Sequence, residues 1–310
     1  MSTSQSGSFR LFRFAGIDVY LHWSWLVVGY FEVKNRAGQF ESAAWNVAEY
    51  LTLFGIVLLH EFGHALACRQ VGGVANRIVL WPLGGIAYVN PPPRPGAWLW
   101  SIAAGPLVNV VLVPLTLGLY ILCGRTGLAA DMPDLHDFLW AVVLMNLGLL
   151  LFNLLPIFPL DGGQIVQALL WFLVGRARSL WIVSVLGLLV GLGMIALALS
   201  AREFWLGIIA VFIALRSWAG FQQARALARL ARAPRHTGYA CPSCGAAPLA
   251  GPHWQCDHCR QHFDTFEQGA VCPGCGKQFA ATACFECGRR HALSDWRLQG
   301  VPEGAPAKTI

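Results

Sequence analysis

Charged residues are scarce in this sequence. Asp, Glu, Lys and Arg make up 12% of its 310 residues, whereas apolar residues make up 56%. Soluble domains carry about twice that share of charge, so an ordinary soluble fold is excluded and a membrane protein is predicted. The charges are also unevenly distributed, because residues 1–220 hold 22 of the 38 charged side chains and the last 90 residues hold 16. This distribution divides the chain into two physically different parts.

Cysteine is nearly absent from the apolar part, which contains only Cys68 and Cys123. The other eight cysteines form four C-x-x-C pairs between Cys241 and Cys287. Such pairs suit metal ions better than a disulfide framework, and they indicate a reducing, cytosolic setting for the tail. The net charge of +6 is spread over loops and a linker, so it indicates membrane topology rather than nucleic-acid binding.

Long apolar runs predict an all-α polytopic membrane protein with about six transmembrane helices. The expected spans are Val19–Phe31, Tyr50–Cys68, Trp98–Leu122, Phe138–Leu155, Leu180–Ser200 and Phe204–Trp218. The Lys and Arg residues beside these runs favour a topology in which both termini are cytosolic.

Two segments outside these runs also have a readable pattern. Asn76–Val89 is rich in β-branched and aromatic residues, which predicts a short membrane-associated β-hairpin at the cytosolic interface or beside a cavity, with a simple loop as the alternative. Phe221–Ala233 is rich in Ala and places Arg225, Arg229 and Arg232 on one helical face. This linker is expected to be a helix that either contacts anionic lipid headgroups or is simply solvated.

The second apolar run contains His60-Glu-Phe-Gly-His64. Two histidines four residues apart project from one face of a helix and can share one zinc ion, and Glu61 lies beside them to take a proton from a metal-bound water. Burying these side chains in an apolar helix is costly. A functional site is therefore favoured over histidines that only hydrogen bond between helices.

A catalytic zinc site needs a third protein ligand and an open position. Asp161 is the candidate, because it lies at the same expected depth as the histidines, and ordinary Asp-Gly turn chemistry is its alternative. Pro156 and Pro159 break the preceding helix and free carbonyl groups that are tolerated only beside protein or water, so a wet pocket is implied. Asn153 is expected to donate a hydrogen bond to a developing oxyanion or to the substrate, or else to bridge two helices.

These segments resemble the site-two protease family, whose members are intramembrane zinc metalloproteases. The resemblance covers about residues 15–220. It rests on four segments: His60–His64, Pro82–Gly85, Ala104–Asn109 and Asn153–Gly163.

The resemblance implies that His60, His64 and Asp161 are zinc ligands and that Glu61 is the general base. Further site residues are expected from the matched segments, namely Asn153 as a catalytic donor and Gly84, Gly85 and Asn109 as substrate-positioning residues. The implied activity is that of a zinc endopeptidase that hydrolyses peptide bonds of transmembrane protein substrates through a zinc-activated water, in regulated intramembrane proteolysis. The implied location is a prokaryotic plasma membrane.

Two other functions were weighed against this one. A catalytically silent membrane adaptor would bind partners through the tail, but it would have no physical reason to keep a buried carboxylate beside two imidazoles. A metal transporter needs polar residues along several spans, whereas here they cluster at one depth. The protease is therefore the favoured hypothesis.

The four C-x-x-C pairs of the tail predict a tandem zinc ribbon with two structural zinc ions, in addition to the catalytic one. Sequential pairing is expected, with Cys241, Cys244, Cys256 and Cys259 in one set and Cys272, Cys275, Cys284 and Cys287 in the other. A cross-braced arrangement and replacement of a thiolate by His253, His258 or His262 stay open. Metal binding would supply most of the folding free energy of so short a segment.

The tail carries charges of both signs rather than a basic stripe, which disfavours nucleic acid. A cytosolic protein partner is preferred, and an inert folding cap is the alternative. The resemblance to the protease family does not extend to this tail. The expected regions are a membrane-embedded domain 1–220, a basic helical linker 221–238, a cytosolic double zinc ribbon 239–292 and a flexible tail 293–310.

Overall fold

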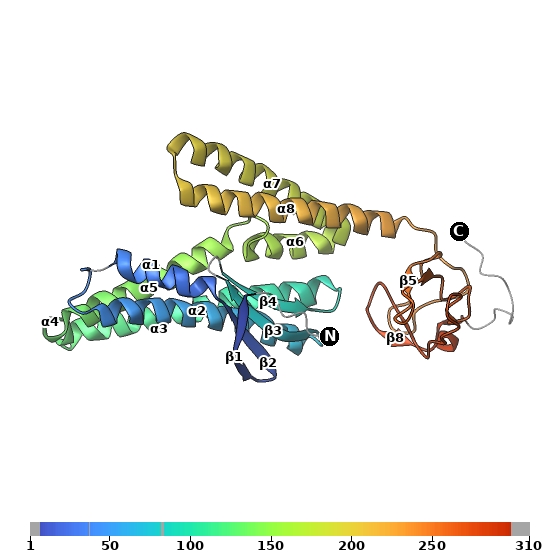
Figure 1. Cartoon of the computed structure of the whole chain (residues 1–310), viewed down its shortest axis with the longest axis horizontal. Coiled ribbons are helices and arrows are strands. Elements are labelled where there is room, and N and C mark those ends of the chain that lie inside the picture. The colour runs from blue at the N-terminus through green and yellow to red at the C-terminus, as the bar shows by residue number, and fades with distance from the viewer. Residues whose placement is uncertain (1–6, 37, 82–83, 299–310) are drawn as a thin grey trace. The chain divides into compact units, whose positions relative to one another are not determined.

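The computed structural model of the chain describes residues 7–36, 38–81 and 84–298. Pro82 and Leu83 of the expected hairpin, and residues 299–310 of the expected flexible tail, lie outside the described residues. Contacts divide the chain into two units, Met1–Phe221 and Gln222–Ile310. The first unit consists of helices and one small sheet, and the second consists of the end of the last long helix, short hairpins and loops (Figure 1).

Five helices among the described residues are long and apolar enough to cross a membrane. They are α2 (Ala43–Gln70), α3 (Pro95–Arg125), α5 (Pro133–Leu154), α7 (Arg176–Ala201) and α8 (Phe204–Ala231). Each contains or closely matches one of the last five expected spans, so those predictions are confirmed. Three shorter helices are α1 (Ser24–Asn35), α4 (Leu128–Asp131) and α6 (Asp161–Val174).

The expected first span, Val19–Phe31, is divided between a strand and a short helix. Strand β2 (Ile17–His22) buries every second side chain from Ile17 to Leu21, which is the periodicity of a strand and not of a helix. Helix α1 has 12 residues, or about 18 Å of helix, which is less than the roughly 30 Å of a hydrocarbon core. The apolar run Val19–Phe31 therefore consists of two elements that are adjacent in the sequence, a strand and a short helix.

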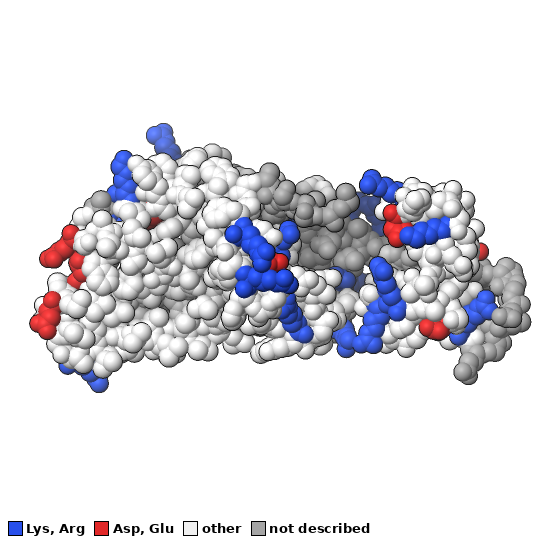
Figure 2. All heavy atoms as spheres, turned by 60° about the horizontal axis from the view of Figure 1, so that its bottom comes forward, with Lys and Arg blue, Asp and Glu red and all other residues white. Residues whose placement is uncertain are grey.

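The surface of the long helices is apolar. Leu199 of α7 and Phe204 of α8 are 75% and 74% exposed, respectively, and many other large apolar side chains are also exposed. The face in Figure 2 has a broad uncharged area, and its Lys, Arg, Asp and Glu side chains gather in separate patches. So much exposed apolar surface is unfavourable in water and is what helices in contact with lipid present.

The sheet has four strands in the order β1 (Ser8–Phe14), β2, β3 (Val74–Trp81) and β4 (Gly84–Asn90). Strands β1 and β2 are antiparallel, β2 and β3 are parallel, and β3 and β4 form the expected hairpin. The sheet is larger than predicted because the N-terminal residues add two strands. Its buried side chains, such as Val19 and Ile78, pack in one hydrophobic cluster with Ala65 and Cys68 of α2.

Arg69, near the end of α2, ties that helix to the sheet. Its Nε donates a hydrogen bond to the carbonyl oxygen of Ala75 at 2.8 Å, and its guanidinium also donates to the carbonyl oxygens of Ala15 and Gly16 in the β1–β2 turn. The sheet is thus fixed against the helix that carries His60 and His64.

Asp161 is positioned by the break between α5 and α6. A Cβ atom at Gly162 would overlap the carbonyl oxygen of Leu154, so only glycine allows the first turn of α6 to pack this closely against the end of α5. Two carbonyl groups in the break are satisfied by side chains: Phe158 accepts from Ser217 Oγ at 2.9 Å, and Pro159 accepts from Gln164 Nε2 at 3.0 Å. The sequence reasoning missed α6, because 14 residues are too few for a span.

In the second unit, β5 (Trp254–Gln255) pairs with β6 (His262–Phe263), and β7 (Thr282–Ala283) pairs with β8 (Arg290–His291). Each hairpin carries one C-x-x-C pair in its turn. Tyr239 and Arg297 form an isolated antiparallel bridge, and the N–H of Ala240 donates to the carbonyl oxygen of Trp296 at 2.7 Å. The first and last segments of the tail therefore lie side by side.

Candidate metal centre

Three ligand atoms converge inside the first unit. His60 and His64 are one turn apart on α2, and their Nε2 atoms are 3.1 Å apart. Asp161, the first residue of α6, places Oδ2 at 3.0 Å from His60 Nε2 and 3.3 Å from His64 Nε2. All three side chains are buried. The structure thus brings together the three residues that the sequence predicts as ligands, and this set could hold a metal ion.

Gly105 of α3 lies directly against the ligand atoms. A Cβ atom at this position would overlap His64 Nε2 and would lie 2.9 Å from His60 Nε2. On the facing helix, a Cβ atom at Gly63 would lie 2.6 Å from the carbonyl oxygen of Ala104, so α2 and α3 pack closely here. Two imidazole nitrogens and one carboxylate are a donor set that fits a catalytic zinc site with three protein ligands.

The other nitrogen of each histidine faces an acceptor on α3. His60 Nδ1 is 2.6 Å from Oδ1 of Asn109, and His64 Nδ1 is 2.9 Å from the carbonyl oxygen of Ser101. Because each acceptor takes a proton from Nδ1, the lone pair of each Nε2 is free for a metal ion. Both rings are therefore oriented for coordination.

Glu61 is buried between α2 and the hairpin. Its Oε2 accepts a hydrogen bond from the backbone N–H of Ala87 on β4 at 2.8 Å. A Cβ atom at Gly85 would overlap Cγ of Glu61, so the glycine allows the strand to approach the carboxylate. Gly84 pairs with Trp81 at the beginning of β4. The hairpin, expected beside the active site, thus contacts the expected general base through its backbone.

The two asparagines predicted for the site have different surroundings. Asn153 is half-buried in the last turn of α5, and within the described part of the chain it forms no hydrogen bond with His60, His64 or Asp161. Asn109 was expected to position the substrate, but its side chain is completely buried and hydrogen bonds to His60. Its contact is therefore with a ligand side chain.

Sequence reasoning missed several groups around this centre. Asn146 of α5 hydrogen bonds to Asn109, and a lone amide in an apolar run could have indicated it. The carbonyl group of Ser101 and the N–H of Ala87 are backbone groups, which leave no signal in the sequence. Gly105 lies in the matched Ala104–Asn109 segment, but its role depends on helix packing.

The cysteines of the tail form two sets that could each hold a metal ion, but they do not pair sequentially. One set contains the first and fourth C-x-x-C pairs, and the other contains the second and third. The shortest contacts between pairs are 3.6 Å for Cys241–Cys287, 3.7 Å for Cys244–Cys284, 3.6 Å for Cys256–Cys275 and 3.5 Å for Cys259–Cys272. The expected sequential pairing is therefore wrong, and the arrangement is nested rather than cross-braced.

The nested pairing follows from the backbone. The bridge between Tyr239 and Arg297 brings the first C-x-x-C pair to the last hairpin, which leaves the two middle pairs to meet each other. No histidine belongs to either cysteine set among the described residues. In the inner set, a hydrogen bond from the backbone N–H of Cys259 is the main cause that lowers the pKa of the Cys256 thiol to about 6. Four sulfur ligands suit structural zinc.

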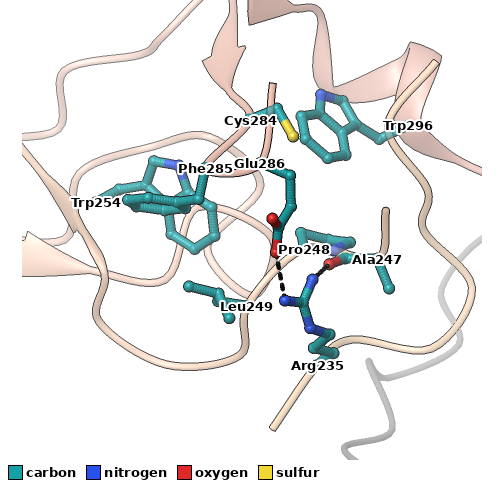
Figure 3. Close-up of a pocket in the computed structure, with 9 residues that line it drawn as sticks. All are labelled: Arg235, Ala247, Pro248, Leu249, Trp254, Cys284, Phe285, Glu286 and Trp296. Atoms are coloured by element: carbon teal, nitrogen blue, oxygen red, sulfur yellow. Dashed lines mark hydrogen bonds and ion pairs between the residues drawn. The ribbon is translucent and has the colours of Figure 1, made fainter. Parts of the chain in front are cut away.

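Two other features lie in the tail. The set of His236, Asp264 and Glu267 could also hold a metal ion. His236 is buried and lies with Nε2 2.7 Å from Oδ2 of Asp264, whose carboxylate also accepts from the backbone N–H groups of Gly251 and Phe266. A hollow of about 10 Å³, which has room for about one water molecule, is bordered by the Arg235–Glu286 ion pair and by apolar side chains such as Trp254 (Figure 3).

Comparison with known proteins identifies the family. The profile of peptidase family M50 matches residues 117–199. The protein YwhC of Bacillus subtilis is 30% identical over 148 residues, which cover 38% of this chain and 67% of that protein. The chain belongs to peptidase family M50. A zinc metalloprotease of Methanocaldococcus jannaschii is 30% identical to this M50 chain over 211 residues, which cover 66% of the chain and 58% of that protein.

A solved structure agrees with the assignment. The site-2 protease from Methanocaldococcus jannaschii matches the M50 chain with a TM-score of 0.50 and 25% sequence identity, over 69% of this chain and 95% of that one. The predicted resemblance to site-two proteases is confirmed, and the M50 chain is an integral membrane protein. The chain spans 58%, 55% and 56% of the length of the first three curated relatives.

Proposed function

We propose that the chain is an intramembrane zinc endopeptidase that hydrolyses peptide bonds of transmembrane protein substrates. The observation that carries this proposal is the convergence of His60 Nε2, His64 Nε2 and Asp161 Oδ2 within 3.3 Å of one another, with Glu61 adjacent to His60. Membership of family M50 supports the same activity.

In this proposal, His60, His64 and Asp161 hold the catalytic zinc. A zinc ion bound by such a set lowers the pKa of water to about 7 and polarises a carbonyl group. Glu61 accepts the proton of the attacking water and returns it to the leaving amine. The N–H of Ala87 orients the carboxylate through Oε2, and Oε1 is left for proton transfer. Asn153 is proposed to donate to the oxygen that becomes negatively charged.

The substrate must be extended before it is cut, because a transmembrane helix hides its peptide bonds in its own hydrogen bonds. Strand β4 is at an edge of the four-stranded sheet and contacts Glu61, so we propose that it holds the unwound substrate as an added strand. Gly84 and Gly85 have no side chains, which would allow a substrate backbone to approach closely.

The rest of the chain fits this role in the following way. The protease lies in a prokaryotic plasma membrane with both termini in the cytosol and takes part in regulated intramembrane proteolysis. The basic end of α8 contacts anionic lipid, and the cysteine-rich tail holds two structural zinc ions and docks a cytosolic protein. With the catalytic ion, the chain binds three zinc ions.

The activity is tested with the purified full chain and a reporter that contains one transmembrane peptide. Glu61→Gln removes the proton acceptor but keeps the shape of the side chain, so we expect cleavage to be lost while the zinc content is unchanged. Glu41→Gln makes the same change at an exposed residue outside the site and is the matched control. Cleavage by Glu61→Gln at the wild-type rate would contradict the role of Glu61, and no cleavage by the wild type would favour the silent adaptor.

A further inference from the structure

Asn146 lies in the interior of α5 and is completely buried. Its amide forms two hydrogen bonds, both with Asn109 on α3. Oδ1 of Asn146 accepts from Nδ2 of Asn109 at 2.7 Å, and Nδ2 of Asn146 donates to the backbone carbonyl oxygen of Asn109 at 3.3 Å. Burying an amide in an apolar helix is costly. Asn146 contacts Asn109, which is itself hydrogen bonded to the metal-ligand candidate His60, so a function for Asn146 is expected.

The backbone carbonyl of Asn109 sets the direction of the whole chain of hydrogen bonds. A carbonyl oxygen can only accept, so Asn146 must turn its Nδ2 towards it. This turns Oδ1 of Asn146 towards Nδ2 of Asn109 and therefore directs Oδ1 of Asn109 to His60 Nδ1. An acceptor at Nδ1 requires that this nitrogen carries the proton, which leaves Nε2 free to bind a metal ion.

The opposite orientation would disable the ligand. If the amide of Asn109 were turned over, its NH₂ group would face His60 Nδ1 and would favour the tautomer with the proton on Nε2. That tautomer cannot coordinate through Nε2. His64 needs no such device, because its Nδ1 faces the backbone carbonyl of Ser101 directly.

We propose that Asn146 is a positioning residue that selects the metal-binding tautomer of His60 through Asn109. The proposal rests on the proposed function, since it deepens the description of the same zinc centre. It assigns Asn109 to the orientation of a ligand instead of the substrate. Loss of a partner that orients a metal-bound histidine costs about 10–100-fold in metal affinity or activity.

A double-mutant cycle in the full chain tests the proposal, with zinc affinity as its main measurement. Zinc retained by the membrane centre is titrated against a chelator, and the His60→Ala/His64→Ala variant gives the signal of the tail alone. We expect Asn146→Leu to lower this affinity about 10-fold and to lower kcat while KM is unchanged. Val142→Ala, another buried position on α5, is the control for lost packing and should keep the wild-type affinity.

The second arm replaces Asn109 with aspartate. A carboxylate presents oxygen to His60 whichever way it is turned, so its orientation no longer depends on Asn146. We therefore expect Asn146→Leu to have little further effect on zinc affinity in the Asn109→Asp background. An equal loss in both backgrounds would mean that Asn146 only packs the helices, and no loss in either would also overturn the proposal. Failure of the protease function is distinguished separately, because it appears as a wild type that does not cleave the transmembrane reporter.

Discussion

The two candidate metal regions of this chain are built on opposite principles. In the membrane unit, the ligands come from helices that pack through apolar side chains, and the set consists of two histidines and one aspartate. In the tail, half of the cysteines lie in the turns of hairpins with strands of two residues, and each set is closed by four sulfur atoms. The first arrangement suits chemistry on a substrate, and the second suits structure.

The membrane unit and the tail also differ in what stabilises their folds. The helices of the membrane unit fold around their own packing and the sheet, so a metal ion there adds function to an existing structure. The tail has two small hydrophobic clusters, one around Trp296 and one around Phe263, and cysteines are members of both. We therefore expect its folding to depend on metal binding.

Removal of zinc should produce the largest difference in behaviour between the membrane unit and the tail. Structural zinc contributes about 10–16 kcal/mol of apparent binding free energy in small zinc domains, so a strong chelator is expected to unfold the tail. The long helices should keep their helical structure. Limited proteolysis and circular dichroism of the chelated chain measure both effects. Loss of helicity together with the tail would show that the membrane unit also depends on zinc for its fold.

A smaller change tests the nested pairing. Cys241 and Cys287 belong to the same set, so Cys241→Ala/Cys287→Ala should remove one tail zinc and leave the inner set loaded. Sequential pairing would instead place the two substitutions in different sets and disturb both. The zinc content of the purified variant distinguishes the two arrangements. Cys241→Ala/Cys256→Ala is the reciprocal control and should disturb both sets.

The close contact between Gly105 and the ligands is tested by Gly105→Ala. The added methyl group would overlap His64 Nε2 and displace the ring, so we expect zinc affinity to fall about 10–100-fold. Gly118→Ala is the matched control on the same helix, because a Cβ atom there meets nothing within 4 Å. Alanine favours a helix over glycine by about 1 kcal/mol, so the control should be neutral or stabilising. Unchanged zinc affinity in Gly105→Ala would contradict this account of the contact.

The sequence predicted the ligand set of the membrane unit better than the cysteine pairing of the tail, because the two sets depend on different kinds of contact. His60 and His64 are one helical turn apart, and Asp161 follows a helix break marked by prolines, so local patterns were sufficient to predict their convergence. The pairing of the cysteines depends on the bridge between Tyr239 and Arg297, which are far apart in the sequence and have no distinctive pattern. C-x-x-C spacing therefore predicted the type of ligand but not its partners.

The same reasoning explains where sequence and structure differ in the membrane unit. Val19–Phe31 was expected to be one span because hydropathy does not separate a buried strand from the helix that follows it. The substrate-positioning role predicted for Asn109 stays a prediction, and its contact with His60 was not foreseen because a sequence motif does not show on which side of a helix an amide is buried. The backbone groups of Ser101 and Ala87 that contact His64 and Glu61 have no counterpart in the sequence.

The most direct test of the account is the zinc content of the full chain, measured for the wild type and for His60→Ala/His64→Ala. The membrane set and the two cysteine sets predict three zinc ions in the wild type and two in the variant, and the remaining two should belong to the cysteine sets. Two zinc ions in both proteins would mean that the membrane centre binds none, and that result would contradict the proposed metalloprotease.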